Sequence, residues 1–168
     1  MRKSLLWATP LLAAVVVAQT TESSKVTRQA KDRSISLHAS NATVHGSTIR
    51  YEPQPHKNTI GYWTKPQDWV SWDFRVNRPG TFLVELTQSC GKGSGGSKYE
   101  LSVADQKLTD VMPETGSFTN WTNRVIGRIE LAKVGQQTLT VKPTHKPGLA
   151  VMDLRAVVLR PADGVSIK

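Results

Sequence analysis

The chain has 168 residues, a formal net charge of +9 and 38% hydrophobic residues, which suits one domain with a real core. The single cysteine, Cys90, excludes an internal disulfide, so we expect the core alone to hold the fold. A basic protein can meet acidic polysaccharide, anionic surfaces or nucleic acid, but its basic residues are spread without a long run, which favours an ordinary solvated surface.

The first residues have the pattern of a secretory signal peptide. Arg2 and Lys3 form a basic head, an apolar run follows to Val17, and small residues precede the cleavage position after Ala18. The run is shorter than the roughly 20 residues of a membrane span. We therefore predict a signal peptide over residues 1–18, a secreted or periplasmic protein, and no membrane span. Residues 19–34 are polar and predict a flexible leader.

Short strands begin at Ile35. The strongest pattern is "WVSWDFRV", residues 69–76, in which Val70, Trp72 and Phe74 alternate with polar residues. The turn "NRPG" separates it from "TFLVELTQSC", residues 81–90, and "KYELSV" follows over residues 98–103. Strict alternation of this kind is typical of half-buried strands, and we assign Trp72 and Cys90 to the core.

The second half of the chain repeats the pattern. Strands are expected in "RVIGRIEL" (124–131), with Val125, Ile129 and Leu131 inward, in "TLTVKP" (138–143) and in "VMDLRAVVL" (151–159). No convincing amphipathic helix occurs. The sequence therefore predicts an all-β protein, an antiparallel β-sandwich of one domain over residues 35–162 with a short tail, 163–168.

Residues 91–96, "GKGSGG", match the dinucleotide-binding pattern G-x-G-x-x-G. That motif needs a helix after the glycines to hold the phosphates, whereas here the strand pattern "KYELSV" follows. A Walker loop is also excluded, because Lys98 follows Ser97 rather than preceding it. We interpret this segment as a flexible, exposed connection between two strands that binds no phosphate.

Enzyme signatures are missing: neither G-x-S-x-G nor H-E-x-x-H occurs, and His38, His45, His56 and His145 lack metal-ligand spacing. We predict no enzyme activity and no cofactor. A catalytic site formed only in three dimensions stays open as an alternative.

Aromatic residues outside the strand cores give the candidate binding site. Tyr62, Trp63 and Trp121 stand among turn residues, where a ring is either an anchor for a loop or an exposed platform. A sugar stacks its apolar face on such a ring and bonds its hydroxyl groups to polar neighbours. Tyr62, Trp63 and Trp121 are therefore the predicted ligand-binding residues.

The stretches "IGYWTKPQDWVSWDFRVNRPGTFLVEL", "GQQTLTVKP" and "AVMDLRAVVL" resemble carbohydrate-binding modules of families 6 and 35, over about residues 35–161. The loop "CGKGSGG" and the ending "KPGLAVMDLR" are most similar to the variant appended to secreted bacterial sulfatases and fucosidases. The resemblance implies a galactose-binding-like jelly roll that binds glycans at its loop edge without catalysis. On this resemblance Tyr62 or Trp63, together with Trp121, would be the binding aromatics.

The resemblance also implies a structural calcium. His38 and Ser40 stand where the family has glutamate ligands, and Val151 stands where many members have an asparagine that contacts the ligand. The predicted function is a secreted, non-catalytic module for polysaccharide, acidic or sulfated through Arg50, His56, Lys57 and Lys146. The alternative is a docking or anchoring sandwich for a secreted sulfatase or glycosidase. Nucleic acid is not expected as a partner.

Overall fold

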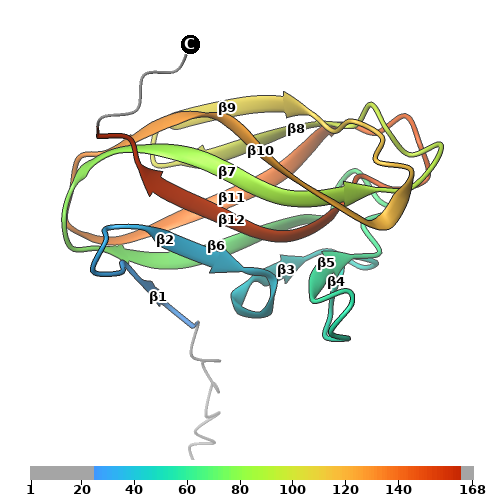
Figure 1. The fold of residues 1–168 in the computed structure, drawn as a ribbon. Helices are drawn as coiled ribbons and strands as arrows, with labels where there is room; N and C mark the ends of the chain where they lie inside the picture. Colours follow the sequence, from blue (N-terminus) through green and yellow to red (C-terminus); the bar gives the residue numbers. More distant parts are fainter. Residues whose placement is uncertain (1–24, 164–168) are drawn as a thin grey trace, which may run out of the picture.

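The computed structural model describes residues 25–163, which form two β-sheets packed face to face (Figure 1). The predicted signal peptide, residues 1–18, and residues 19–24 and 164–168 lie outside the described part of the chain. Within residues 25–163 the one helical segment is a three-residue 3-10 turn, Ala39–Asn41. The predicted all-β class is therefore confirmed.

The strands follow one another along the chain with short connections. Their bounds are β1 Thr27–Arg28, β2 Ile35–His38, β3 Thr43–His45, β4 Arg50–Glu52, β5 Thr59–Gly61, β6 Trp69–Val76, β7 Gly80–Cys90, β8 Lys98–Val103, β9 Gln106–Val111, β10 Ser117–Leu131, β11 Gly135–His145 and β12 Asp153–Pro161.

Each sheet mixes strands from both halves of the chain. One has the order β1-β6-β11-β8-β9, with β3 also paired to β6, and the other has the order β10-β7-β12-β5-β4, with β2 also paired to β12. The paired strands are antiparallel except β1 and β6, which are parallel. The last strand, β12, therefore lies in the centre of its sheet, between β7 and β5, as its nearly continuous apolar sequence requires.

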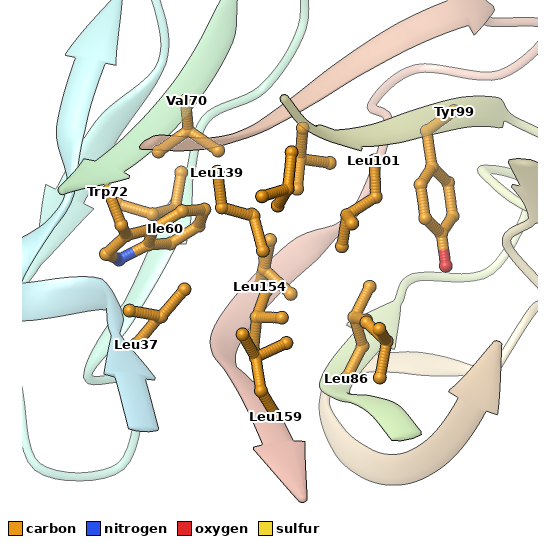
Figure 2. Close-up of a cluster of buried hydrophobic side chains, with 14 of the residues drawn as sticks. Leu37, Ile60, Val70, Trp72, Leu86, Tyr99, Leu101, Leu139, Leu154 and Leu159 are labelled. Carbon is orange, nitrogen blue, oxygen red and sulfur yellow. The ribbon is translucent and has the colours of Figure 1, made fainter. Parts of the chain in front are cut away.

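The core lies between the two sheets and is built from the inward faces of the alternating strands. Val70, Trp72 and Phe74 of β6 are buried, and Trp72 donates its indole N–H to the carbonyl of His38 at 2.8 Å. Figure 2 shows the Trp72 ring among aliphatic side chains such as Leu139. The predicted core faces of β6, β7 and β8 are confirmed, because strict alternation directs one side of each strand to the other sheet.

Strand β10 departs from the predicted pattern. It extends over residues 117–131, and its register against β7 shifts between Val125 and Gly127. This bulge inserts an extra residue and reverses the facing of the strand. Ile129 and Leu131 are buried as expected, whereas Val125 is 50% exposed, so its assignment to the core is wrong.

Part of the predicted leader belongs to the fold. Strand β1 pairs with β6, and the side chain of Gln29 is buried. Its amide oxygen accepts from the backbone N–H groups of Asn77 and Arg78, and its amide nitrogen donates to two carbonyls. The prediction of a flexible leader is wrong for residues 25–34, because hydrogen bonds made by one glutamine fix this segment where apolar residues are scarce.

The glycine-rich segment joins β7 to β8, as predicted, but it is packed more closely than a flexible loop. A Cβ at Gly91 would lie 2.3 Å from the ring of Phe118, and one at Gly148 would lie 2.6 Å from the backbone of Ser94. Ser94 is itself buried. The glycines therefore allow three segments to approach one another at this end of the sandwich.

Candidate functional site

One end of the sandwich gathers the β4–β5 hairpin, the end of β7 and the starts of β10 and β12, on the right in Figure 1. The pairing of Leu154 with Ile60 sets β12 beside β5, and the pairing of Ser117 with Cys90 sets β10 beside β7. A pocket of about 330 Å³ opens here. Its lining residues are Glu52, Lys57, Tyr62, Thr64, Phe118, Leu149, Ala150 and Asp153.

Tyr62 forms one wall of the pocket in an unusual backbone conformation. Its φ of +53° places it in the left-handed region, which disfavours a bulky residue. The ring is 50% exposed, and the guanidinium carbon of Arg50 stacks 3.5 Å from its centroid. Arg50 covers one face of the ring and does not line the pocket, which leaves the other face for a ligand.

Apolar groups from two further segments complete the walls. Phe118 at the start of β10 is half-buried, and Leu149, before β12, is 80% exposed. The Phe118 ring rests on Gly91, where any larger residue would displace it. An apolar, partly aromatic wall of this kind suits a ligand with an apolar face.

The floor of the pocket is an ion-paired cluster. The ammonium group of Lys57 contacts the carboxylate of Asp153 and lies 3.4 Å from Oε2 of Glu52. The cluster sits directly on Gly61, since a Cβ there would lie 2.0 Å from Oε2 of Glu52 and 3.1 Å from Oδ1 of Asp153. The Arg155 guanidinium donates to the backbone carbonyl of Lys57 at 2.8 Å and so fixes the hairpin that carries the lysine.

Burial dominates the electrostatics of this floor. Asp153 is only 3% exposed, and this desolvation raises the pKa of its carboxyl to about 6, although the hydrogen bond and charge of Lys57 act in the opposite direction. The nearby charge of Glu52 adds to the rise in pKa. Two carboxyl groups thus share one ammonium group at the bottom of a largely apolar pocket.

Trp121 lies next to the pocket rather than in it. It belongs to β10, not to a loop, and its half-buried ring stacks on the guanidinium of Arg155 with 3.8 Å from the guanidinium carbon to the ring centroid. The same guanidinium is bonded to the backbone of Lys57. Trp121 is therefore connected to the pocket through Arg155, and its part in binding stays a prediction.

Trp63 is a core residue, and its prediction as a ligand contact is wrong. The side chain is fully buried, and its indole N–H donates to the carbonyl of Asp68 at 2.8 Å. Tyr62 is half exposed and lines the pocket whereas its neighbour Trp63 is fully buried, so adjacent rings have opposite environments.

Sequence reasoning missed most of the pocket. Glu52, Phe118 and Leu149 carry no periodic or motif signal, and Lys57 was expected only as a charge for acidic ligands. Lys57 and Asp153 are 96 positions apart, and only the pairing of β5 with β12 brings them together. Lys57 and Lys146, expected to attract acidic ligands, are engaged instead: Lys57 by carboxylates and Lys146 by the carbonyls of Gly148 and Leu149.

Other features of the described part of the chain bear on the remaining predictions. Among residues 25–163 no group of three or more His, Cys, Asp or Glu side chains is arranged to hold a metal ion. Within the same residues no helix has the length and apolar character to cross a membrane. Cys90 is buried, which raises the pKa of its thiol to about 11, in keeping with its assignment to the core.

The fold is that of carbohydrate-binding modules of families 6 and 35. The C-terminal family 6 module of a marine laminarinase from Zobellia galactanivorans is 14% identical, with a TM-score of 0.60 over 76% of this chain and 98% of that one. A family 35 module from Clostridium thermocellum is 12% identical, with a TM-score of 0.62 over 77% and 98% of the two chains. A family 6 module of Cellvibrio mixtus lichenase 5A, solved with cellotriose, is 18% identical, with a TM-score of 0.57 over 74% and 95%.

Residues 38–163 match the model of DUF5077, described as a domain of unknown function, and the chain belongs to this family. No curated protein matches the chain.

Proposed function

We propose that this protein is a secreted, non-catalytic carbohydrate-binding module whose pocket holds a sugar of a polysaccharide. The observation that carries the proposal is the Tyr62 ring, half exposed, standing over the polar floor of Lys57, Glu52 and Asp153. Sugars present an apolar C–H face to an aromatic ring and hydroxyl groups to polar partners, and this pocket offers both. The likeness to family 6 and 35 modules supports the same function.

Trp121 is proposed as a second contact for a neighbouring sugar unit. Its ring lies outside the pocket but is joined to it by Arg155, so a chain that leaves the pocket toward β10 reaches this ring. Each of these two rings has a guanidinium group on one face, that of Arg50 on Tyr62 and that of Arg155 on Trp121. These two arginines support a preference for acidic or sulfated polysaccharide, because guanidinium groups bond carboxylate and sulfate oxygens strongly.

Binding without cleavage is proposed because one lysine holds both carboxyl groups of the pocket floor. A glycosidase needs one carboxyl group as an acid and another free to act as a base or nucleophile. Incubation with bound oligosaccharide, followed by product analysis, is expected to show no released sugar. Released sugar that disappears in the Asp153→Asn variant would favour the enzyme alternative.

The binding test is retardation of the protein in native gels that contain neutral, uronic-acid or sulfated polysaccharides. We expect weak binding, in the micromolar to millimolar range, because few sugar units contact the rings. Tyr62→Ala is expected to abolish retardation and Trp121→Ala to weaken it. Trp69→Ala, which removes a half-buried tryptophan from the other sheet, is the matched control and should bind normally.

Salt dependence separates the charge contribution from stacking. Retardation by a sulfated polysaccharide is expected to weaken with added salt, because exposed charges are screened beyond about 8–10 Å. Equal retardation by neutral and sulfated chains would remove the acidic preference but leave the pocket proposal intact.

A docking or anchoring domain is the second candidate. The observation in its favour is Leu149, which is 80% exposed at the rim of the pocket, as an anchor for a protein partner would be. If the folded protein binds no class of polysaccharide at millimolar concentration, this candidate is favoured over glycan binding.

A further inference from the structure

The pocket floor holds a primary amine against a buried carboxyl group, with a second carboxyl group beside them. The Nζ of Lys57 contacts Oδ2 of Asp153 and lies 3.4 Å from Oε2 of Glu52, and the three side chains are exposed by 15%, 5% and 15%. We propose that Lys57 and Asp153 condense to an intramolecular amide, an isopeptide bond, and that Glu52 transfers the protons. This proposal does not rest on sugar binding, and the amide would replace the ion pair between Lys57 and Asp153 in the pocket floor.

The fold holds the reacting groups in place before any reaction. Arg155 fixes the backbone at Lys57, because its guanidinium donates two hydrogen bonds to the Lys57 carbonyl, at 3.1 and 2.8 Å. Asp153 begins the central strand β12, and Glu52 ends β4, which β5 links to β12. Reactions between groups held in contact reach effective molarities of about 10⁵–10⁸ M, enough to favour a condensation that is negligible between free groups in water.

Burial favours the protonated carboxyl group of Asp153 and the uncharged product. An amine attacks only in its neutral form, and a carboxyl group is attacked readily only when protonated. The Asp153 environment favours protonation because desolvation raises its pKa to about 6. Condensation also removes two charges from a poorly solvated site, where an ion pair recovers its desolvation cost incompletely.

The step balances without any further reagent. A proton passes from the Lys57 ammonium to the Asp153 carboxylate, and the neutral Nζ attacks Cγ of Asp153. The carboxylate of Glu52 takes a proton from Nζ and delivers it to the departing hydroxyl group. The Cγ–O bond breaks, one water molecule leaves through the open pocket, an Nζ–Cγ amide remains, and Glu52 returns to its starting charge.

Alternatives elsewhere in the described residues have a weaker basis. The Trp69 ring has His45 stacked at 3.6 Å on it and the Lys142 ammonium 4.2 Å from its centroid, so little of it is free for a ligand. The carboxylate of Asp68 is occupied by hydrogen bonds from Ser47, Thr48 and Ile49. The Lys57 cluster is set apart because its amine contacts one buried carboxyl group and lies 3.4 Å from a second.

Intact-mass spectrometry of the purified full-length protein tests the proposal. The wild-type protein is expected to be lighter by one water molecule than its sequence requires, relative to a Lys57→Arg variant with the same processed N-terminus. Digestion with trypsin should leave the bond after Lys57 uncut and yield a branched peptide that contains Asp153. A wild-type protein with the mass of the unmodified sequence, and a linear peptide ending at Lys57, would overturn the proposal.

Two variants separate the amide from an ordinary ion pair. Glu52→Gln keeps the size of the proton carrier but removes its basicity, so this variant is expected to keep its unmodified mass and, by circular dichroism, its fold. Asp153→Asn should lose ammonia in place of water, and its product is then identical in mass to the wild-type product. A branched peptide of the same mass from both proteins locates the bond at this position. Complete modification of the Glu52→Gln variant would rule out Glu52 as the proton carrier.

Discussion

At the residue scale, Tyr62 has a conformation that tyrosine rarely adopts. Non-glycine residues in the left-handed region cost about 1–3 kcal/mol and persist where the surrounding structure requires them. Here the neighbours are a buried Trp63 and a Glu52 carboxylate packed on Gly61, which together fix the path of the chain. The strain is therefore tied to presenting a ring at the pocket.

Substitutions at Tyr62 separate strain from binding. Tyr62→Gly relieves the strain and Tyr62→Ala keeps it, so the glycine variant should be more stable by about 1 kcal/mol. Both variants lose the ring and should lose glycan retardation equally. Urea unfolding measures the difference. An alanine variant as stable as the glycine variant would contradict the argument.

Trp72 is the corresponding case in the core. It is 1% exposed and its indole N–H is bonded to His38, so Trp72→Ala should lower the free energy of unfolding by about 3–5 kcal/mol. Trp69→Ala, on the same strand, should lower the free energy of unfolding clearly less, because the Trp69 side chain is only half-buried. Similar melting temperatures for these two variants would place Trp72 outside the core.

At the scale of elements, the connection between β3 and β4 depends on one carboxylate. Asp68 is 2% exposed and accepts hydrogen bonds from the backbone N–H groups of Ser47, Thr48 and Ile49. Desolvation alone would raise the pKa of Asp68, but these bonds together outweigh it and hold the pKa below 3.8. Gly46 permits the approach, since a Cβ there would lie 2.2 Å from the carboxylate.

This arrangement predicts a pH-dependent contribution to stability. Because the folded pKa lies below the unfolded value of 3.8, the contribution is complete above that pH and is lost as the pH falls through the folded pKa. Asp68→Asn should lower the free energy of unfolding by about 1.5–3 kcal/mol at neutral pH, and the difference should shrink in acid.

Urea unfolding of the wild type and the Asp68→Asn variant, between about pH 2 and pH 7, measures this contribution. Asp105→Asn, in an exposed turn, is the control and should leave stability unchanged. A difference between wild type and Asp68→Asn that stays constant into acid would show that ionisation of Asp68 is irrelevant.

At the scale of the whole molecule, the N-terminal segment covers one edge of the sandwich. It lies beside the C-terminal part of β6. Strand β1 adds to β6 in parallel, and Gln29 bonds the β6–β7 turn through Asn77 and Arg78. Arg33 extends the same link by pairing with Asp163 after the last strand. The segment therefore links the β6–β7 turn to the residues that follow the last strand.

Gln29→Ala should lower the free energy of unfolding by about 1–3 kcal/mol, because it leaves the N–H groups of Asn77 and Arg78 without their partner. Thermal unfolding measures the loss. Lys25→Ala, at an exposed position two residues before β1, is the control. Equal melting temperatures for wild type and Gln29→Ala would show that the hydrogen bonds of Gln29 do not stabilise the fold.

The sequence by itself determined the class of fold and most of the core. Alternation is a local property, because each strand directs successive side chains to opposite faces whatever its neighbours are. Residues 69–76, 81–90 and 98–103 therefore predicted β6, β7 and β8 with their buried faces. The prediction that Val125 faces inward was wrong because a bulge interrupts β10, and alternation does not reveal a bulge.

The tertiary structure alone decided the site. Tyr62 and Trp63 are neighbours in a turn-like sequence, and only the backbone conformation sends one to the pocket and the other to the core. Lys57 and Asp153 lie in segments with no common pattern, and they meet because β5 pairs with β12. Strand order depends on contacts between distant residues, whereas periodicity reports only on near neighbours. The sequence therefore named Tyr62 and Lys57 but not the pocket that joins them to Asp153.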